Sequence, residues 1–171
     1  RSTVWRGDSG LLALLILLLA SNLSGGASDD LGKALESYQA HRFEEAKRRF
    51  EAFIEEFPQD LNLPRALYHL AELERDPSTV LEYYGRILAE HPQSEVADSA
   101  LFRIGLYRIA SGQSGEAGGA FTRLLAQYPQ SALVQKARYW LAISCLARND
   151  RVSAIGELKE VVRTSPHSEY G

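Results

Sequence analysis

Cysteine is almost absent from this sequence, because Cys145 is the single one among 171 residues. One cysteine excludes a disulfide framework within the chain and a cysteine-based zinc site. Two interpretations of Cys145 stay open. It is a small buried apolar side chain, or it is a thiol that forms a redox or intermolecular disulfide in an oxidising compartment.

The sequence also lacks an excess of positive charge. It has 19 Lys and Arg against 22 Asp and Glu, for a formal net charge of −3. Proteins that bind nucleic acid usually carry a basic patch, so we expect no nucleic-acid partner.

Patterns that would indicate catalysis or metal binding are missing as well. The four histidines occupy different positions of the repeat described below. In the carboxylate-rich segment FEEAKRRFEAFIEEF, Glu44 with Arg48 and Glu45 with Arg49 have the spacing of solvated helix pairs. SGQSGEAGG, at residues 111–119, is not followed by the Lys-Ser/Thr of a phosphate-binding loop. We therefore predict no catalytic residue, no metal site and no cofactor.

The longest apolar run, Leu11 to Ala20, is short. Ten helical residues rise about 15 Å, whereas the hydrocarbon core of a bilayer is about 30 Å thick. Arg1 and Arg6 precede the run and SNLSGGA follows it, which is the layout of a secretory signal. We expect residues 1–27 to be a signal peptide cleaved after Ala27; the alternative is an uncleaved N-terminal membrane anchor.

What the sequence does contain is an internal repeat. Its markers are Pro58, Pro92, Pro129 and Pro166, which lie 34, 37 and 37 residues apart. Apolar or small residues recur 12, 8, 5 and 4 positions before each proline, which is one face of a helix. Small residues recur 8 and 13 positions after the first three prolines and indicate a second helix that packs closely. The shorter spacing predicts a three-residue deletion in the turn ERDPST, where Asp76 caps and Pro77 begins a helix.

The prolines and the residues two positions later are predicted to separate the helices. Proline ends one helix, and the side chains of Asp60, Ser94, Ser131 and Ser168 can cap the next, with Pro64 moving one start to Asn62. The predicted architecture is an all-α, right-handed solenoid of helix-turn-helix repeats. Residues 28–165 form four repeats, at about 31–57, 62–91, 94–128 and 131–165, and residues 166–171 begin a fifth.

With small residues, an aromatic and a proline at these spacings, the chain resembles the tetratricopeptide repeat family. The residues that carry the resemblance are Phe43, Ala46, Phe50 and Pro58, and then Gly105, Ala117, Phe121 and Pro129. The extra three residues per repeat and the YPQS phrasing are similar to a subgroup in bacterial envelope proteins. That subgroup includes a Tol-Pal-associated periplasmic division coordinator and an outer-membrane assembly lipoprotein. This chain lacks the lipidated cysteine of the second and has no room for the N-terminal coiled coil of the first.

The resemblance also implies where a partner binds. In the family, four positions of the first helix of each repeat line a concave groove. On this chain they are Arg65, Tyr68, Glu72, Ser99, Phe102, Leu106, Ile109, Lys136, Tyr139 and Ile143. Tyr68, Phe102 and Tyr139 share one offset and would form an aromatic column. The alternative is that these three rings pack between repeats.

The function expected from these features is a non-enzymatic scaffold, exported to the periplasm or cell envelope, that binds a protein or peptide segment. The resemblance implies a role in envelope assembly or division. The alternative is the helical arm of a longer envelope enzyme, with a catalytic domain beyond residue 171. Self-association through the last repeat is a further expectation, and contact with a membrane is expected only through an uncleaved N-terminal segment.

Overall fold

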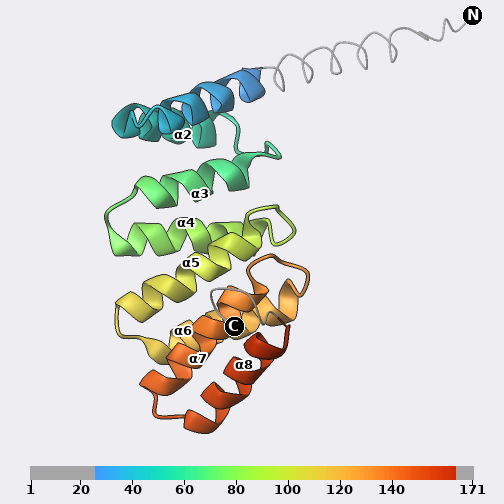
Figure 1. The fold of residues 1–171 in the computed structure, drawn as a ribbon. Coiled ribbons are helices and arrows are strands. Elements are labelled where there is room, and N and C mark those ends of the chain that lie inside the picture. The colour runs from blue at the N-terminus through green and yellow to red at the C-terminus, as the bar shows by residue number, and fades with distance from the viewer. Residues whose placement is uncertain (1–25, 165–171) are drawn as a thin grey trace, which may run out of the picture. The chain divides into compact units, whose positions relative to one another are not determined.

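The computed structural model describes residues 26–164, and this part of the chain is helical without any strand (Figure 1). The first helix spans residues 26–39. The next seven are α2 (Phe43–Glu56), α3 (Leu63–Leu73), α4 (Pro77–Glu90), α5 (Ala97–Ala110), α6 (Ser114–Gln127), α7 (Val134–Ala147) and α8 (Arg151–Thr164). The predicted all-α fold of paired helices is confirmed. We call the first helix of each pair the A helix and the second the B helix.

Short turns connect the A helix of each pair to its B helix. In three of the four turns the middle residue has a positive φ: His41 at 57°, Gly112 at 74° and Asn149 at 62°. A left-handed residue lets the chain leave the helix while the amide after it still bonds back. In these three turns Arg42 N donates to Ser37 O at 2.9 Å, Gln113 N to Arg108 O at 2.8 Å and Asp150 N to Cys145 O at 2.9 Å.

The second pair is shorter for a different reason from the one predicted. α3 has 11 residues, whereas α4 to α8 each have 14. The turn after it, residues 74–76, is as long as the turns at 111–113 and 148–150. The deletion therefore shortens the helix, and the prediction of a shorter turn is wrong. Glu74 Oε1 instead accepts the amides of Arg75 at 2.7 Å and Asp76 at 3.1 Å.

The predicted cap of α4 is confirmed. Asp76 is the N-cap residue, its Oδ2 accepts the amide of Thr79 at 2.9 Å, and Pro77 is the first helical residue. The carbonyl of Asn62 accepts the amides of Arg65 at 3.0 Å and Ala66 at 3.1 Å, so α3 starts where Pro64 led us to expect.

The caps predicted at two serines are wrong. Residues 94–96 and 131–133 form turns before α5 and α7, whose N-cap residues are Val96 and Leu133. The hydroxyl of Ser94 is buried and has no hydrogen-bond partner among the described residues. The Ser131 hydroxyl accepts the Leu133 amide at 3.0 Å and donates to Asp98 Oδ2, so it orders the turn and not the helix end.

The small residues of the repeat are buried as predicted. They include Ala34, Ala66, Ala71, Ala100, Gly105, Ala137 and Ala142 on A helices, and Ala46, Ala117 and Ala154 on B helices. At Gly105 the close neighbour is a side chain. A Cβ there would lie 2.5 Å from the ring of Phe121. The glycine therefore makes room for an aromatic ring of the paired B helix.

The apolar face predicted for the B helices is buried at three of its four offsets in most repeats. Phe50, Phe53, Phe121, Leu124 and Ile87 are among the largest fully buried side chains. The residue four before the proline is less covered in three of the repeats: Ile54 and Leu125 are half-buried, and Val162 on α8 is 53% exposed, whereas Leu88 is buried. Val152 and Ile155 lie on the same helix and are also exposed.

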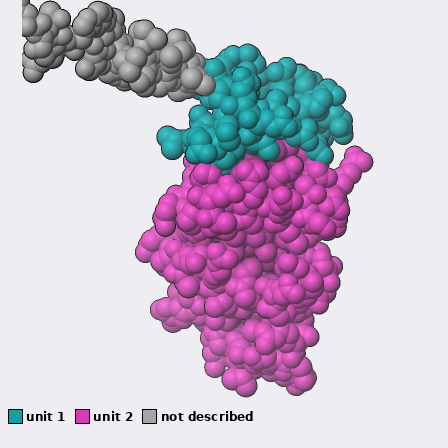
Figure 2. Space-filling view, turned by 180° about the vertical axis from the view of Figure 1, so that it is seen from behind, with its two compact units in different colours: residues 1–66 teal, residues 67–171 magenta. Residues whose placement is uncertain are grey.

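The chain divides into two compact units, residues 1–66 and 67–171, coloured separately in Figure 2. The boundary falls inside α3. In the first unit, Leu31 and Ala34 of the first helix and Phe50 and Phe53 of α2 are buried. The second unit holds the rest of α3 and helices α4 to α8.

Parts of the predicted domain organisation lie outside the described residues. These are residues 1–25 of the predicted signal segment and residues 165–171, with Pro166, His167 and Ser168. Of the predicted signal segment, only Gly26 and Ala27 are described; both belong to the first helix, and Ala27 is buried.

Candidate functional site

The ten residues predicted to bind a partner are surface residues in the structure. We call the nine of them that belong to the second unit the A-helix face. Arg65, which belongs to the first unit, and Lys136 on α7 are exposed. The other eight belong to the second unit and are half-buried: Tyr68, Glu72, Ser99, Phe102, Leu106, Ile109, Tyr139 and Ile143. None of them lies in the core, which is a condition for contact with a partner. Their role in binding stays a prediction.

Two of the three aromatic residues on this face pack against the B helix of their own repeat. The ring of Tyr68 on α3 lies 5.5 Å from that of Tyr84 on α4, and the ring of Phe102 on α5 lies 5.7 Å from that of Phe121 on α6. Tyr84 and Phe121 are buried. Each of these two A-helix rings thus packs on one side against the core of its own repeat. Contact with a partner and packing between repeats both stay predictions.

Tyr139 on α7 stands in a different environment. Its ring lies 5.8 Å from that of Trp140 in an edge-to-face arrangement, at an interplanar angle of 83°. Both rings are half-buried. Edge-to-face pairs of this kind add to the stability of an aromatic cluster beyond the area they bury.

A residue that the sequence analysis missed connects two A helices. Arg103 on α5 donates from Nη2 to Glu72 Oε1 at 2.9 Å and from Nε to the Tyr68 hydroxyl at 3.2 Å. Glu72 also lies 3.2 Å from Nδ1 of His69 on its own helix. The hydrogen bond to Tyr68 and the nearby acidic groups raise the pKa of Arg103, whose guanidinium stays charged. Arg103 follows Tyr68 by one repeat and one residue, a spacing that on its own does not indicate contact.

The structure also has a hollow of about 670 Å³ in the second unit, which we call the glycine hollow. It is lined by residues of α6, α7 and α8 and of the turn between α7 and α8: Gly115, Gly118, Gly119, Thr122, Arg123, Ala126, Leu141, Cys145, Arg148, Asp150, Ser153 and Glu157. None of the residues predicted to bind a partner belongs to it. The sequence signal that could have indicated it is the pair of adjacent glycines in a predicted B helix.

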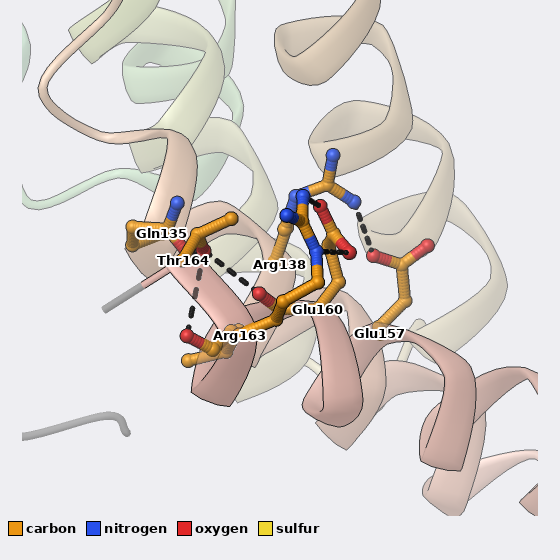
Figure 3. A network of polar contacts seen from close by, with 7 residues as sticks. Gln135, Arg138, Glu157, Glu160, Arg163 and Thr164 are labelled. Atoms are coloured by element: carbon orange, nitrogen blue, oxygen red, sulfur yellow. Dashed lines mark hydrogen bonds and ion pairs between the residues drawn. The ribbon is translucent and has the colours of Figure 1, made fainter. Parts of the chain in front are cut away.

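Polar contacts hold α8, one wall of this hollow, against α7 (Figure 3). Arg138 Nη1 lies 2.8 Å from Glu157 Oε2, and the Thr164 hydroxyl lies 3.0 Å from Gln135 Oε1. Within α8, Arg163 Nη2 lies 2.6 Å from Glu160 Oε1. The wall is therefore fixed by contacts that lie outside the hollow, apart from Glu157.

Within residues 26–164 no cluster of three His, Cys, Asp or Glu side chains could hold a metal ion. Cys145 is buried, and burial, with Asp150 nearby, raises the pKa of its thiol. A protonated thiol is a poor nucleophile.

None of the helices in the described part of the chain is both long and apolar enough to cross a membrane. The apolar run Leu11–Ala20 lies outside the described residues.

Comparison with protein families supports the repeat assignment. Residues 102–169 match the model of the tetratricopeptide repeat family. No curated protein sequence matches the chain.

Solved structures show the same fold at low sequence identity. A crystal structure of the protein MamA matches with a TM-score of 0.67 and 15% identity, over 87% of this chain and 77% of that one. A structure of MamA AMB-1 matches with a TM-score of 0.67 and 12% identity, over 84% of this chain and 75% of that one. YrrB is described as a tetratricopeptide repeat protein with an unusual peptide-binding site. Its structure matches with a TM-score of 0.65 and 20% identity, over 86% of this chain and 73% of that one. The chain is thus a repeat protein with the tetratricopeptide fold.

Proposed function

We propose that this chain is an exported, non-enzymatic scaffold that binds a protein or peptide segment on its A-helix face. The observation that carries the proposal is the register of Tyr68, Phe102 and Tyr139. They occupy the same position on three successive A helices, and each is only half-buried. Aromatic side chains in partly covered positions, flanked by cationic ones such as Lys136, are frequent anchors of protein interfaces.

The fold supports this proposal. Repeat proteins present extended surfaces that suit a segment of chain, and their function is usually binding. The peptide-binding site described for YrrB shows that this fold can hold a peptide.

The cell envelope is the proposed setting, because residues 1–27 have the layout of a secretory signal. The resemblance of the repeats to the bacterial envelope subgroup makes envelope assembly or division the proposed process. The test is a fusion of residues 1–27 to a reporter enzyme that is active only after export. We expect activity in the periplasm, and loss of it when Leu14 and Leu15 are both replaced by Arg. An equally inactive reporter with the native segment would contradict export.

Binding on the A-helix face is tested by removing aliphatic side chains there. The double variant Ile109→Ser and Ile143→Ser changes two half-buried residues of this face. The matched control, Val152→Ser and Ile155→Ser, removes two exposed aliphatic side chains of α8. Immobilised chains are incubated with an envelope extract and the retained proteins are identified by mass spectrometry. We expect the A-helix variant to lose proteins that the wild type and the control both retain.

Two results would count against the proposal. If both double variants retain the same proteins as the wild type, the partner does not bind on the A-helix face. If Tyr139→Ala lowers the free energy of unfolding as much as a fully buried aromatic would, about 3–5 kcal/mol, the ring belongs to the core.

Self-association stays a separate expectation. The observation that favours it is the exposure of Val152, Ile155 and Val162 along α8, with Val152 at 84%. Light scattering of the wild type and of the Val152→Ser and Ile155→Ser variant tests self-association. A monomer mass for the wild type that does not change with concentration would contradict it.

A further inference from the structure

The glycine hollow and the A-helix face lie on opposite sides of α7. Leu141, Cys145 and Arg148 line the hollow at spacings of four and three residues. Leu141 lies two residues from Tyr139, and Cys145 lies two residues from Ile143, which is about 200° of helical rotation in each case. Arg148 follows the end of α7. A ligand in the hollow would therefore leave the A-helix face free.

Three glycines of α6 line the hollow: Gly115, Gly118 and Gly119. At Gly118 the space is tight, since a Cβ would lie 3.0 Å from the Ser144 hydroxyl. At Gly115 and Gly119 a Cβ would meet nothing within 4 Å. Glycine is less favourable than alanine inside a helix. Packing therefore favours glycine at one of the three positions, and at the other two nothing in the fold requires it, so glycine there lowers helix stability without a packing gain.

The charges that line the hollow are not balanced once their contacts are considered. Both carboxylates are engaged: Asp150 Oδ1 accepts the amide of Ser153 at 3.1 Å, and Glu157 pairs with Arg138 at 2.8 Å. Hydrogen bonds from Ser153, and then the nearby charge of Arg148, lower the pKa of Asp150, so it stays ionised in this role.

The two cations of the hollow are less engaged. Arg123 Nε donates to the amide oxygen of Gln127 at 3.2 Å and has no carboxylate partner among the described residues. The Arg148 guanidinium makes no side-chain hydrogen bond or ion pair within the described chain. Its Nη1 lies 3.8 Å from the place where a Cβ of Gly118 would stand. Arg148 thus places a positive charge beside Gly118, with Asp150 nearby.

We propose that the glycine hollow is a second binding site, which takes an acidic side chain and a neighbouring apolar side chain of a peptide segment. Arg148 binds the carboxylate, for which the two parallel donors of a guanidinium are well suited. Arg123 adds positive charge, and Leu141 with Ala126 offers an apolar surface. The volume of about 670 Å³ is within the range of about 300–1,000 Å³ of ligand pockets.

The same charges select against polyanions. Asp150 and Glu157 stand in the lining and the chain has a formal net charge of −3. A nucleic acid or a polyphosphate would meet both carboxylates, whereas a single carboxylate can be placed at Arg148. The site therefore suits isolated acidic side chains on a peptide.

The experiment follows the backbone amides of the glycines by ¹⁵N NMR of the full chain. The probe is a capped hexapeptide of alternating leucine and aspartate, and the neutral probe has asparagine in place of aspartate. We expect saturable shifts of the Gly115, Gly118 and Gly119 amides with the acidic peptide only. Arg148→Gln is expected to weaken binding at least tenfold. Equal shifts with the asparagine peptide or with inorganic phosphate alone, or an unchanged affinity in Arg148→Gln, would overturn the proposal.

A pair of glycine variants separates blocking of the hollow from a general effect on the fold. Gly119→Leu places a side chain in the hollow, whereas Gly156→Leu makes the same change on α8, where a Cβ also meets nothing within 4 Å and the residue does not line the hollow. We expect loss of peptide binding in the first and wild-type affinity in the second, with the same helical circular dichroism. Wild-type affinity in Gly119→Leu would refute the site. The Ile109→Ser and Ile143→Ser variant should bind the acidic peptide normally, so a failure of the A-helix face is distinguishable from a failure here.

Discussion

Arg103 on α5 lies 2.9 Å from Glu72 on α3, and this ion pair connects the A helices of two successive repeats. The Glu72 side chain is only 18% exposed, whereas that of Arg103 is 47% exposed. Because the same guanidinium donates to the Tyr68 hydroxyl, it fixes two of the residues predicted to contact a partner. The ion pair thus orders part of the A-helix face before any partner binds.

The first prediction concerns the strength of this connection. Arg103→Leu and Glu72→Gln, alone and together, form a double-mutant cycle measured by urea unfolding. We expect a coupling free energy of about 0.2–1 kcal/mol, since Arg103 is half in solvent and water screens the pair. The control is Arg86→Leu, which removes an ion pair with Glu90 within α4, where about 0.3–0.5 kcal/mol is expected. A coupling of zero would show that the contact does not order the face.

The second prediction compares two glycines of opposite kind. In Gly105→Ala the new Cβ would lie 2.5 Å from the ring of Phe121, which is fully buried and cannot move without disturbing the core. We expect a loss of about 1–3 kcal/mol in the free energy of unfolding, as for other overpacked cores.

Gly119→Ala is the matched variant, because its Cβ meets nothing within 4 Å. Here the higher helix propensity of alanine should raise the free energy of unfolding by up to about 1 kcal/mol. Urea unfolding of both variants checks the pair. If both variants change the free energy of unfolding by the same amount in the same direction, the spaces around Gly105 and Gly119 do not differ as described.

The positions of these glycines show what the sequence could predict. A period of 34 to 37 residues fixes which positions recur, and a buried small residue at each recurrence follows from close helix packing. Gly105 was therefore identified as a buried position, although the ring of Phe121 that fills its space was not. The helix caps were less predictable, because the turns that contain Ser94 and Ser131 insert two residues between the hydroxyl and the helix.

The parts of the candidate site that escaped prediction depend on contacts across helices. The bond between Arg103 and Tyr68 requires a particular side-chain direction on each of two helices, which periodicity does not encode. The shortening of α3, and not of its turn, depends on where the helix ends, and the periodicity did not indicate that Glu74 accepts two amides just after it. The glycine hollow arises from the absence of side chains, which a search for functional groups does not detect.

The third prediction uses the cap of α4. The amide and hydroxyl of Thr79 donate to Asp76, and these bonds lower the pKa of its carboxyl below the ordinary value of 3.8. A lowered pKa means that the ionised form stabilises the folded state. The contribution is complete above the unfolded pKa and is lost as the pH falls through the folded pKa.

Asp76→Ala should therefore lower the unfolding temperature by a constant amount between about pH 5 and 8, and by less below about pH 3.8. Thermal unfolding followed by circular dichroism at several pH values measures the difference. Asp76→Asn is the control, since asparagine also caps but does not titrate. A difference that grows as the pH falls would contradict the assigned role of the carboxylate.

The fourth prediction concerns Cys145, which lines the glycine hollow but is only 6% exposed. Burial and then the charge of Asp150 raise the pKa of its thiol above the ordinary 9.0. Only the thiolate reacts with disulfide reagents, so Cys145 should react slowly in the folded chain at pH 8 and much faster in urea.

The reaction rate of Cys145 in the folded chain should still rise with pH where an ordinary thiol is already fully ionised. It should fall further in Gly119→Leu, whose new side chain covers the hollow. Absorbance after addition of an aromatic disulfide measures these rates, with Cys145→Ala as the blank. If the rate in the folded chain equals the rate in urea, Cys145 is an accessible thiol. That outcome would favour the interpretation of Cys145 as a redox or intermolecular disulfide site.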